Sequence, residues 1–174
     1  PEYIRAKYAE SAPLFLTVYH WFARQAARLV PPPPGAQLPY WTTADPMGVD
    51  LSGGGQVLRL EVPRSQAVFF RLRDWSQVLQ LRLLTDNPAE ETALQRELDL
   101  RGVDRRQVVL TDFYPEWKQL ILHSWERLFC VHASVRDGVL AQTEGIQAAL
   151  WCLRREWLAP QMNHPPSAHR FGGI

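Results

Sequence analysis

The chain has 174 residues, of which 46% are hydrophobic, and its formal net charge at pH 7 is +1. This composition is typical of a single globular domain with enough apolar side chains to build a core. Basic and acidic residues are interspersed, which argues against a nucleic-acid-binding surface. No apolar run approaches about 18 residues and no signal peptide is visible, so we expect no membrane-spanning helix.

The two ends of the chain and its cysteines add three expectations. The chain begins at Pro1 without a methionine, so we expect it to be processed, trimmed or incomplete at its start. Residues 161–174 contain two prolines and two glycines, and we expect a flexible tail after a single domain of residues 1–160. Cys130 and Cys152 are the only cysteines, and we interpret them as buried free thiols in a reducing cytosol.

The first elements should be a helix and a short strand. Ser11 can cap a helix that tolerates Pro13 in its first turn and carries an apolar stripe to about residue 30. The run Pro31–Gly35 should stop this helix and impose an extended connection. Residues 40–43 (YWTT) are strand-prone, and a loop should follow over residues 46–55. Its three glycines resemble a phosphate-binding loop only superficially, because no Lys-Ser/Thr and no helix follow them.

The stretch of residues 57–84 should organise the fold. In residues 57–62 apolar side chains alternate with charged ones, which predicts a half-buried strand that ends at Pro63. Residues 67–72 form a more continuous apolar run, typical of a central strand that is covered on both faces. The short polar link between the two runs favours an antiparallel hairpin. Asp74 is a good N-cap for a helix that begins at Trp75.

The second half of the chain reads mainly as helices. Asn87, with Glu90 in the capping-box position, should begin a helix that runs to about Arg101 and ends at Gly102. Residues 108–110 are predicted to form another strand, residues 115–129 a strong helix and residues 133–138 a turn. A final helix is predicted over residues 143–158, because apolar side chains recur there at spacings of four, three and four.

One group of side chains could in principle bind a metal ion. His123 and Glu126 lie one helical turn apart, and Cys130 and His132 follow. Their spacings match no zinc signature, and the group falls across a predicted helix end. We therefore expect no metal site, and we expect Glu126 to form a structural ion pair or to cap a neighbouring backbone.

The tripeptide Gln142–Glu144 has the Q-x-E form that holds the nicotinamide ribose in many ADP-ribosyltransferases. In those enzymes the glutamate lies on a loop that leads into a strand, whereas the residues after Glu144 are predicted here to be helical. Residues 40–43 could stand in for the aromatic-Ser-Thr strand of that fold. This alternative makes the chain an enzyme that consumes NAD, with Glu144 as its acidic catalytic residue.

A cluster of aromatic and polar residues is the other candidate site. Gln147 lies at the edge of a predicted apolar helix face beside Trp151, and its amide must find hydrogen-bond partners in the fold or on a ligand. The tryptophans at positions 41, 75, 125 and 151 could line one pocket, and they could equally form the core. Our candidate ligand-binding residues are Trp41, Trp75, Glu126 and Gln147.

Several motifs resemble, in the same order, a family of small bacterial proteins catalogued as a domain of unknown function (number 3841). These motifs are PPPPG with PYW, then VLRLEVP, FFRLRDWSQVL, SWERLF and IQAALWCL, and they span roughly residues 19–157. The resemblance implies a single domain of bacterial or phage, cytoplasmic origin and no established activity. The family usually opens with an additional apolar strand, and this chain starts too late to show it. The matching motifs contain Trp41, Asp74, Trp75, Trp125, Glu126, Arg127 and Gln147.

The sequence therefore predicts a single α+β domain with a small, mainly antiparallel sheet packed by several helices. We expect a module that binds a small molecule or a protein partner through an aromatic-lined cleft, without nucleic acid, membrane or cofactor. The alternative is an ADP-ribosyltransferase-like toxin or effector that uses NAD. A third possibility is a structural subunit with an aromatic oligomer interface. The ligand, the partner and the oligomeric state stay open.

Overall fold

A short apolar strand is the centre of the fold. In this computed structural model, which describes residues 11–45, 49, 57–140 and 144–160, β3 (Ile146–Leu150) lies between β1 (Tyr40–Thr43) and β2 (Ala67–Arg71). Both neighbours pair with β3 in the antiparallel sense. All residues of β3 except Gln147 are buried, as expected of a central strand that is covered on both faces.

The pairing register assigns the side chains to two faces. Trp41, Ala149 and Val68 are opposite one another across the three strands, and Thr43, Gln147 and Phe70 form the next such row. Because side chains alternate along a strand, these two rows share one face. Val68, Phe70 and Ala149 belong to the larger core cluster on that face, whereas Phe69, Ile146 and Ala148 belong to a smaller cluster on the opposite face.

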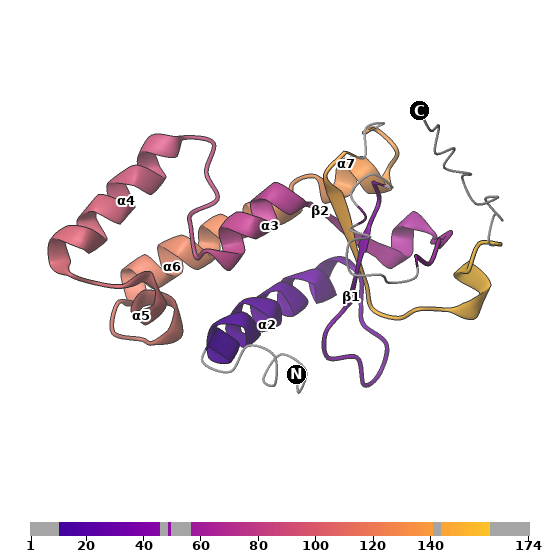
Figure 1. Cartoon of the computed structure of the whole chain (residues 1–174), viewed down its shortest axis with the longest axis horizontal. Coiled ribbons are helices and arrows are strands. Elements are labelled where there is room, and N and C mark those ends of the chain that lie inside the picture. Colours follow the sequence, from indigo (N-terminus) through magenta and orange to yellow (C-terminus); the bar gives the residue numbers. More distant parts are fainter. Residues whose placement is uncertain (1–10, 46–48, 50–56, 141–143, 161–174) are drawn as a thin grey trace, which may run out of the picture.

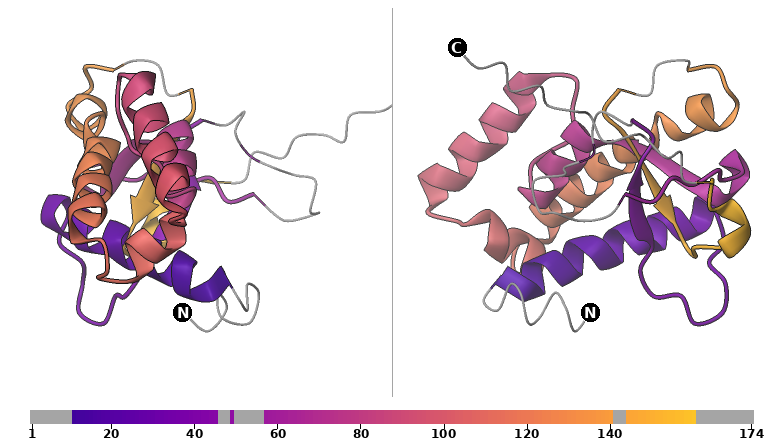
Figure 2. Two further views of the ribbon diagram at one scale, coloured as in Figure 1. Left: turned by 90° about the vertical axis from the view of Figure 1, so that its left-hand side faces the viewer. Right: turned by 45° about the vertical axis from the view of Figure 1, so that its right-hand side comes forward.

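Helices cover both faces of the sheet and extend away from it (Figures 1 and 2). The larger cluster packs the sheet against α2 (Ala12–Leu29) and α3 (Leu72–Leu79). The smaller cluster packs the sheet against α7 (His132–Arg136). In Figure 1, α4 (Pro88–Arg101), α5 (Arg105–Leu110) and α6 (Pro115–Ser124) form the left-hand part of the molecule. The predicted α+β class, with its small antiparallel sheet, is confirmed.

The elements with clear end signals are confirmed. Helix α2 has Pro13 in its first turn, although Ser11 makes no side-chain cap. Strand β1 occupies the predicted residues. Helix α4 follows Asn87, whose Oδ1 accepts a hydrogen bond from the Ala89 N–H at 3.1 Å, and it ends at Gly102 in the left-handed conformation with φ of 65°. The described residues contain no helix that is both long and apolar enough to cross a membrane.

The predicted hairpin of residues 57–72 is wrong. Residues 59–61 pair with residues 157–159 through an isolated bridge at Leu60, while β2 pairs with β3. The link of residues 64–66 is a 3₁₀ turn, η3 (Arg64–Gln66), which separates the two extended segments. Asp74 is not the N-cap of α3, because the helix already begins at Leu72, and the Asp74 carboxylate lies 3.3 Å from Arg73 Nε.

Three further predictions in the middle of the chain need correction. Residues 105–110 form α5 and not a strand, since the Asp104 carboxylate caps the Arg106 N–H at 2.7 Å and so starts a helix. The predicted helix 115–129 is divided at Ser124 into α6 and the 3₁₀ helix η4 (Trp125–Phe129). The predicted turn at residues 133–138 lies mostly within the short helix α7.

The predicted final helix over residues 143–158 is the largest error. Residues 146–150 are strand β3, and residues 155–157 form the 3₁₀ helix η5 (Arg155–Trp157). The spacing of Ile146, Leu150 and Trp157 suggested one apolar stripe, but every residue from 148 to 151 is buried. A run of this kind belongs to a strand that is covered on both faces. Trp151 then donates from Nε1 to the Val30 carbonyl at 2.7 Å, which joins the end of β3 to the end of α2.

The two cysteines are less buried than the sequence predicted. Cys130 is exposed and Cys152 is partly exposed, so the expectation of two buried thiols is wrong, although both are free. The glycine loop, Gln142 and the predicted tail of residues 161–174 lie outside the described residues.

Candidate functional site

Five aromatic rings meet on one face of the sheet, and we call them the aromatic cluster. They come from α2, β1, β2 and α3, and they are Tyr19, Phe22, Trp41, Phe70 and Trp75. The centroid of the Trp41 ring lies 4.7 Å from that of Phe22 and 4.8 Å from that of Trp75. Trp75 is only 4% exposed, whereas Tyr19 and Trp41 are partly exposed. The cluster is therefore a filled core with an accessible edge, and the predicted aromatic-lined cleft is not an open space there.

Gln147 joins this face of the sheet from the central strand. It is opposite Thr43 on one side and Phe70 on the other, and it is only partly buried. Gln147 is two residues from Ala149 along the strand, so its side chain is on the same face as that of Ala149 and Trp41. Within the described part of the chain, no hydrogen bond joins its side-chain amide to another group. Three of the four predicted ligand-binding residues, Trp41, Trp75 and Gln147, are thus brought to one face.

Glu144 lies at the end of the sheet where β3 begins. It is exposed and occupies a turn with Gly145, which adopts φ of 65°. Hydrogen bonds join this turn to the residues that follow β1 and β2. The Gly145 N–H donates to Asp45 Oδ2 at 3.4 Å, and the Gly145 carbonyl accepts from the Leu72 N–H at 2.9 Å. Glu144 is therefore on a turn that leads directly into a strand and not at the start of a helix.

Glu126 lies apart from the aromatic cluster. Its carboxylate is about half exposed on η4 and approaches His123 Nδ1 at 3.5 Å. The residues around Glu126 form hydrogen bonds with the segment 81–86, which connects α3 to α4 and which we call the strap. Trp125 Nε1 donates to the Arg82 carbonyl at 2.7 Å, and Ser124 Oγ accepts from the Leu84 N–H at 3.1 Å.

Side chains of α4 and α5 also form hydrogen bonds with the backbone of the strap. Glu91 Oε2 accepts from the Leu83 N–H at 2.9 Å, and Arg105 Nη1 donates to the Leu81 carbonyl at 3.1 Å. Glu91 and Arg105 also form an ion pair of 2.8 Å in which both side chains are largely buried. Arg127 pairs with Asp86 at the end of the strap, and this hydrogen-bonded carboxylate raises the pKa of Arg127. Sequence reasoning missed this network, because its members are 8 to 43 residues apart from their partners.

The candidate metal ligands do not come together. His132 is buried beside the edge strand β2, where its Nδ1 accepts from the Phe69 N–H at 3.2 Å, whereas His123 and Glu126 are exposed. Among the described residues, no three His, Cys, Asp or Glu side chains are close enough to hold a metal ion.

Comparison with protein families gives one match. The family model described as Domain of unknown function (DUF3841) covers residues 1–159. The chain belongs to this family. Comparison of the DUF3841 chain with curated proteins and with solved structures found no significant match. The family description assigns no activity, so any functional assignment depends on the geometry of this chain.

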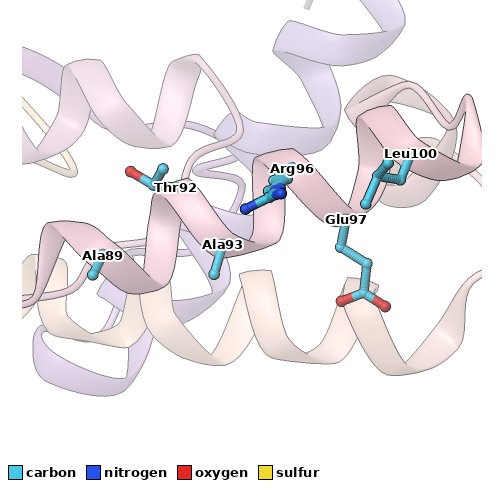
Figure 3. Close-up of a pocket in the computed structure, with 6 residues that line it drawn as sticks. All are labelled: Ala89, Thr92, Ala93, Arg96, Glu97 and Leu100. Carbon is cyan, nitrogen blue, oxygen red and sulfur yellow. The ribbon is translucent and has the colours of Figure 1, made fainter.

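Two shallow hollows lie on the surface of this DUF3841 domain, away from the aromatic cluster. The larger, of about 550 Å³, follows the outward face of α4 (Figure 3). The smaller, of about 290 Å³, lies between the strap and α6 and is bordered by His123 and Arg127. Neither hollow is lined by Trp41, Trp75, Glu126, Glu144 or Gln147.

Proposed function

We propose that this DUF3841 domain is a binding module for a small molecule, with its site at the end of the sheet where β3 begins. The observation that carries the proposal is the position of Gln147 beside Thr43, on the sheet face that carries the partly exposed Trp41. A tryptophan ring offers a flat apolar surface, and an amide offers both donors and an acceptor. A ligand with a flat ring and a polar edge suits this combination.

The side-chain amide of Gln147 places a more specific requirement on a ligand than the Trp41 ring does. A half-buried side-chain amide that finds no partner among its described neighbours is costly once a ligand excludes water, unless the ligand supplies the hydrogen bonds. The Trp75 ring is buried against Trp41, so it would not contact the ligand itself and would instead hold the Trp41 ring in position. We leave Glu126 out of the proposed site, because it is on η4 with His123 as its neighbour.

A thermal-shift screen with nucleotides, NAD and common metabolites tests this proposal. A true ligand at about 100 times its dissociation constant should add roughly 2.7 kcal/mol of apparent stability. Gln147→Leu keeps the size of the side chain and removes its hydrogen bonds, so it should abolish the shift. Glu126→Gln is the matched control and should retain it. No shift with any compound, or a shift that Gln147→Leu leaves unchanged, would contradict the proposed site, and a pull-down would then test for a protein partner.

A second candidate function is an ADP-ribosyltransferase-like enzyme that consumes NAD. The observation in its favour is that Glu144 lies on a turn that leads into a strand, and that this strand pairs with β1, the YWTT segment. Such an enzyme would transfer the ADP-ribosyl group and release nicotinamide. Release of nicotinamide from NAD, lost in Glu144→Gln at an unchanged melting temperature, would favour it over the binding module. NAD that stays intact with the wild-type chain would exclude this activity under the conditions tested.

A further inference from the structure

Helix α4 presents an outward face that no other described element covers. The face consists of Ala89, Thr92, Ala93, Arg96, Glu97 and Leu100, which line the larger hollow. All six are exposed, and Leu100 is 79% exposed. The opposite side of α4 holds Leu94 and Leu98, which are 5% and 0% exposed in the core. Figures 1 and 2 show α4 at the outer end of the molecule.

The order of residues along this face makes it complementary to itself. The six positions are separated by three, one, three, one and three residues, so they form one stripe on the helix. In an antiparallel pair of α4 helices, Ala89 would be opposite Leu100 of the second copy, and Ala93 opposite Arg96. Each large side chain would then meet a small one. A parallel pair would instead place Leu100 against Leu100 and leave a gap between the two alanines.

The charges favour the same arrangement. Glu90 and Arg101 lie along one edge of the stripe, near opposite ends of the helix. Arg101 pairs with Glu97 of its own helix at 3.0 Å, but its side chain is 64% exposed and so stays accessible to a second carboxylate. Antiparallel pairing brings Arg101 of each copy close to Glu90 of the other, and this contact occurs twice by symmetry. Within the stripe itself, Glu97 is already paired with Arg101, so Arg96 is the charge that each copy adds to the contact, opposite Ala93 of the other. Parallel pairing would instead bring the two Arg96 side chains together near the middle of the stripe, which is unfavourable, and would move the Glu90 and Arg101 edges of the two copies to opposite sides of the contact.

We propose that two copies of this chain associate through α4, antiparallel and related by a two-fold axis. The partner is a second copy because the size pattern and the charges of the face complement themselves. The proposal does not depend on the proposed ligand site, which lies at the sheet. One helix of 14 residues is about 21 Å long. Such a small interface gives a weak dimer that forms as concentration rises.

Sedimentation equilibrium of the full chain is the first test. The weight-average mass should rise from 20.0 kDa toward twice that value between about ten and several hundred micromolar. Leu100→Asp should keep the mass at the monomer value at every concentration. Val139→Asp is the matched control, because Val139 is 80% exposed in the segment after α7, and it should associate like the wild type. A wild-type chain that stays monomeric throughout, or a Leu100→Asp variant that still associates, would overturn the proposal.

Disulfide trapping tests the register. In a background with Cys130→Ser and Cys152→Ser, a mixture of the Ala89→Cys and Leu100→Cys variants should form a cross-linked dimer upon mild oxidation. Either variant alone should not form this cross-link, because the introduced cysteines of its two copies would lie about 16 Å apart along the paired helices. Equal cross-linking in the mixture and in the single variants, or none in the mixture, would exclude the antiparallel pairing. Charge exchange adds a check: Glu90→Arg, which keeps the Arg101–Glu97 pair, should weaken association, and the double variant Glu90→Arg/Arg101→Glu should restore it.

Discussion

His132 is the buried polar side chain on which the outer edge of the sheet depends. It is 3% exposed, and no other polar side chain of the described residues is buried to this degree. Its Nδ1 accepts from the Phe69 N–H, so in the neutral ring the proton is on Nε2. Because Phe69 belongs to an edge strand, this bond satisfies a backbone donor that no strand could pair. The His132 side chain thus accepts a hydrogen bond that a neighbouring strand would otherwise accept.

This role makes stability depend on pH. Burial lowers the pKa of His132 from its ordinary 6.5, with Arg136 acting in the same direction and Asp137 opposing it. The unfolded chain therefore binds a proton at a pH at which the folded chain does not. Stability is fully present above about pH 6.5 and decreases as the pH falls from there through the lowered pKa of the folded state. Urea unfolding at pH 7.5 and at pH 5 should show this loss for the wild type.

Two histidine variants separate this effect from general acid destabilisation. His132→Ala leaves the Phe69 N–H unpaired and should cost about 1–3 kcal/mol at neutral pH. Its unfolding midpoint should then depend less on pH than that of the wild type. His123→Ala removes an 84% exposed ring and should preserve the wild-type pH dependence. A His132→Ala variant as sensitive to acid as the wild type would assign the effect to other groups.

At the scale of elements, the division of α6 from η4 is explained by the strap. A regular helix through residue 129 is what the apolar spacing predicts, but Ser124 and Trp125 direct their polar atoms to the strap. Ser124 Oγ also donates to the Ile121 carbonyl at 2.7 Å, which ties it to the last turn of α6. The geometry of the SWERLF motif is thus set by a segment about 40 residues earlier in the chain.

Removing the Ser124 hydroxyl tests the importance of the strap. Ser124→Ala leaves the Leu84 N–H without its partner in a largely buried position, so we expect a loss of about 1–3 kcal/mol in unfolding free energy. Ser76→Ala is the matched control, because Ser76 Oγ also donates to a helix carbonyl, that of Leu72, but does so in an exposed position. It should change stability by no more than about 0.5 kcal/mol. Equal effects of the two substitutions, measured by urea unfolding, would show that the strap contact is unimportant.

Local signals account for the elements that the sequence predicted correctly. Helix α4 has Asn87 at its start and Gly102 at its end, and both act within one turn of the helix. Strand β3 has no such signals. Its run IQAAL fits a helix or a covered strand equally well by spacing, and only its pairing with residues at least 75 positions away decides between them. The hairpin prediction failed for the same reason, since β2 pairs with β3 and not with its neighbour in sequence.

For the candidate site, the sequence predicted the residue types but not their arrangement. The aromatic residues and Gln147 stand out by type, and the sequence indicated that they could meet. Their common face follows only from the register of β1 and β2 on β3. The position of Glu144 depended entirely on the assignment of residues 146–150, because the same glutamate begins a helix in one interpretation and precedes a strand in the other.

At the scale of the whole molecule, one thin sheet joins two hydrophobic clusters. The larger cluster contains or contacts six of the seven tryptophans, whereas the smaller cluster contains none. Phe69 and Phe70 are adjacent in β2 and belong to different clusters. A loss of packing on either face must therefore disturb the strands that support the other face, which predicts a single cooperative unfolding transition.

A substitution far from the tryptophans tests this cooperativity. Val135→Ala creates a small cavity in the smaller cluster and should cost about 1–3 kcal/mol. Tryptophan fluorescence reports on the larger cluster, yet its thermal midpoint should fall by the same amount as the midpoint from far-UV circular dichroism. Val78→Ala, at a fully buried position of the larger cluster, provides the reciprocal control. A shared sheet cannot lose the packing of one face and keep the other intact. A Val135→Ala variant that shifted only the circular dichroism transition would therefore contradict this prediction and show that the two faces are separate cooperative units.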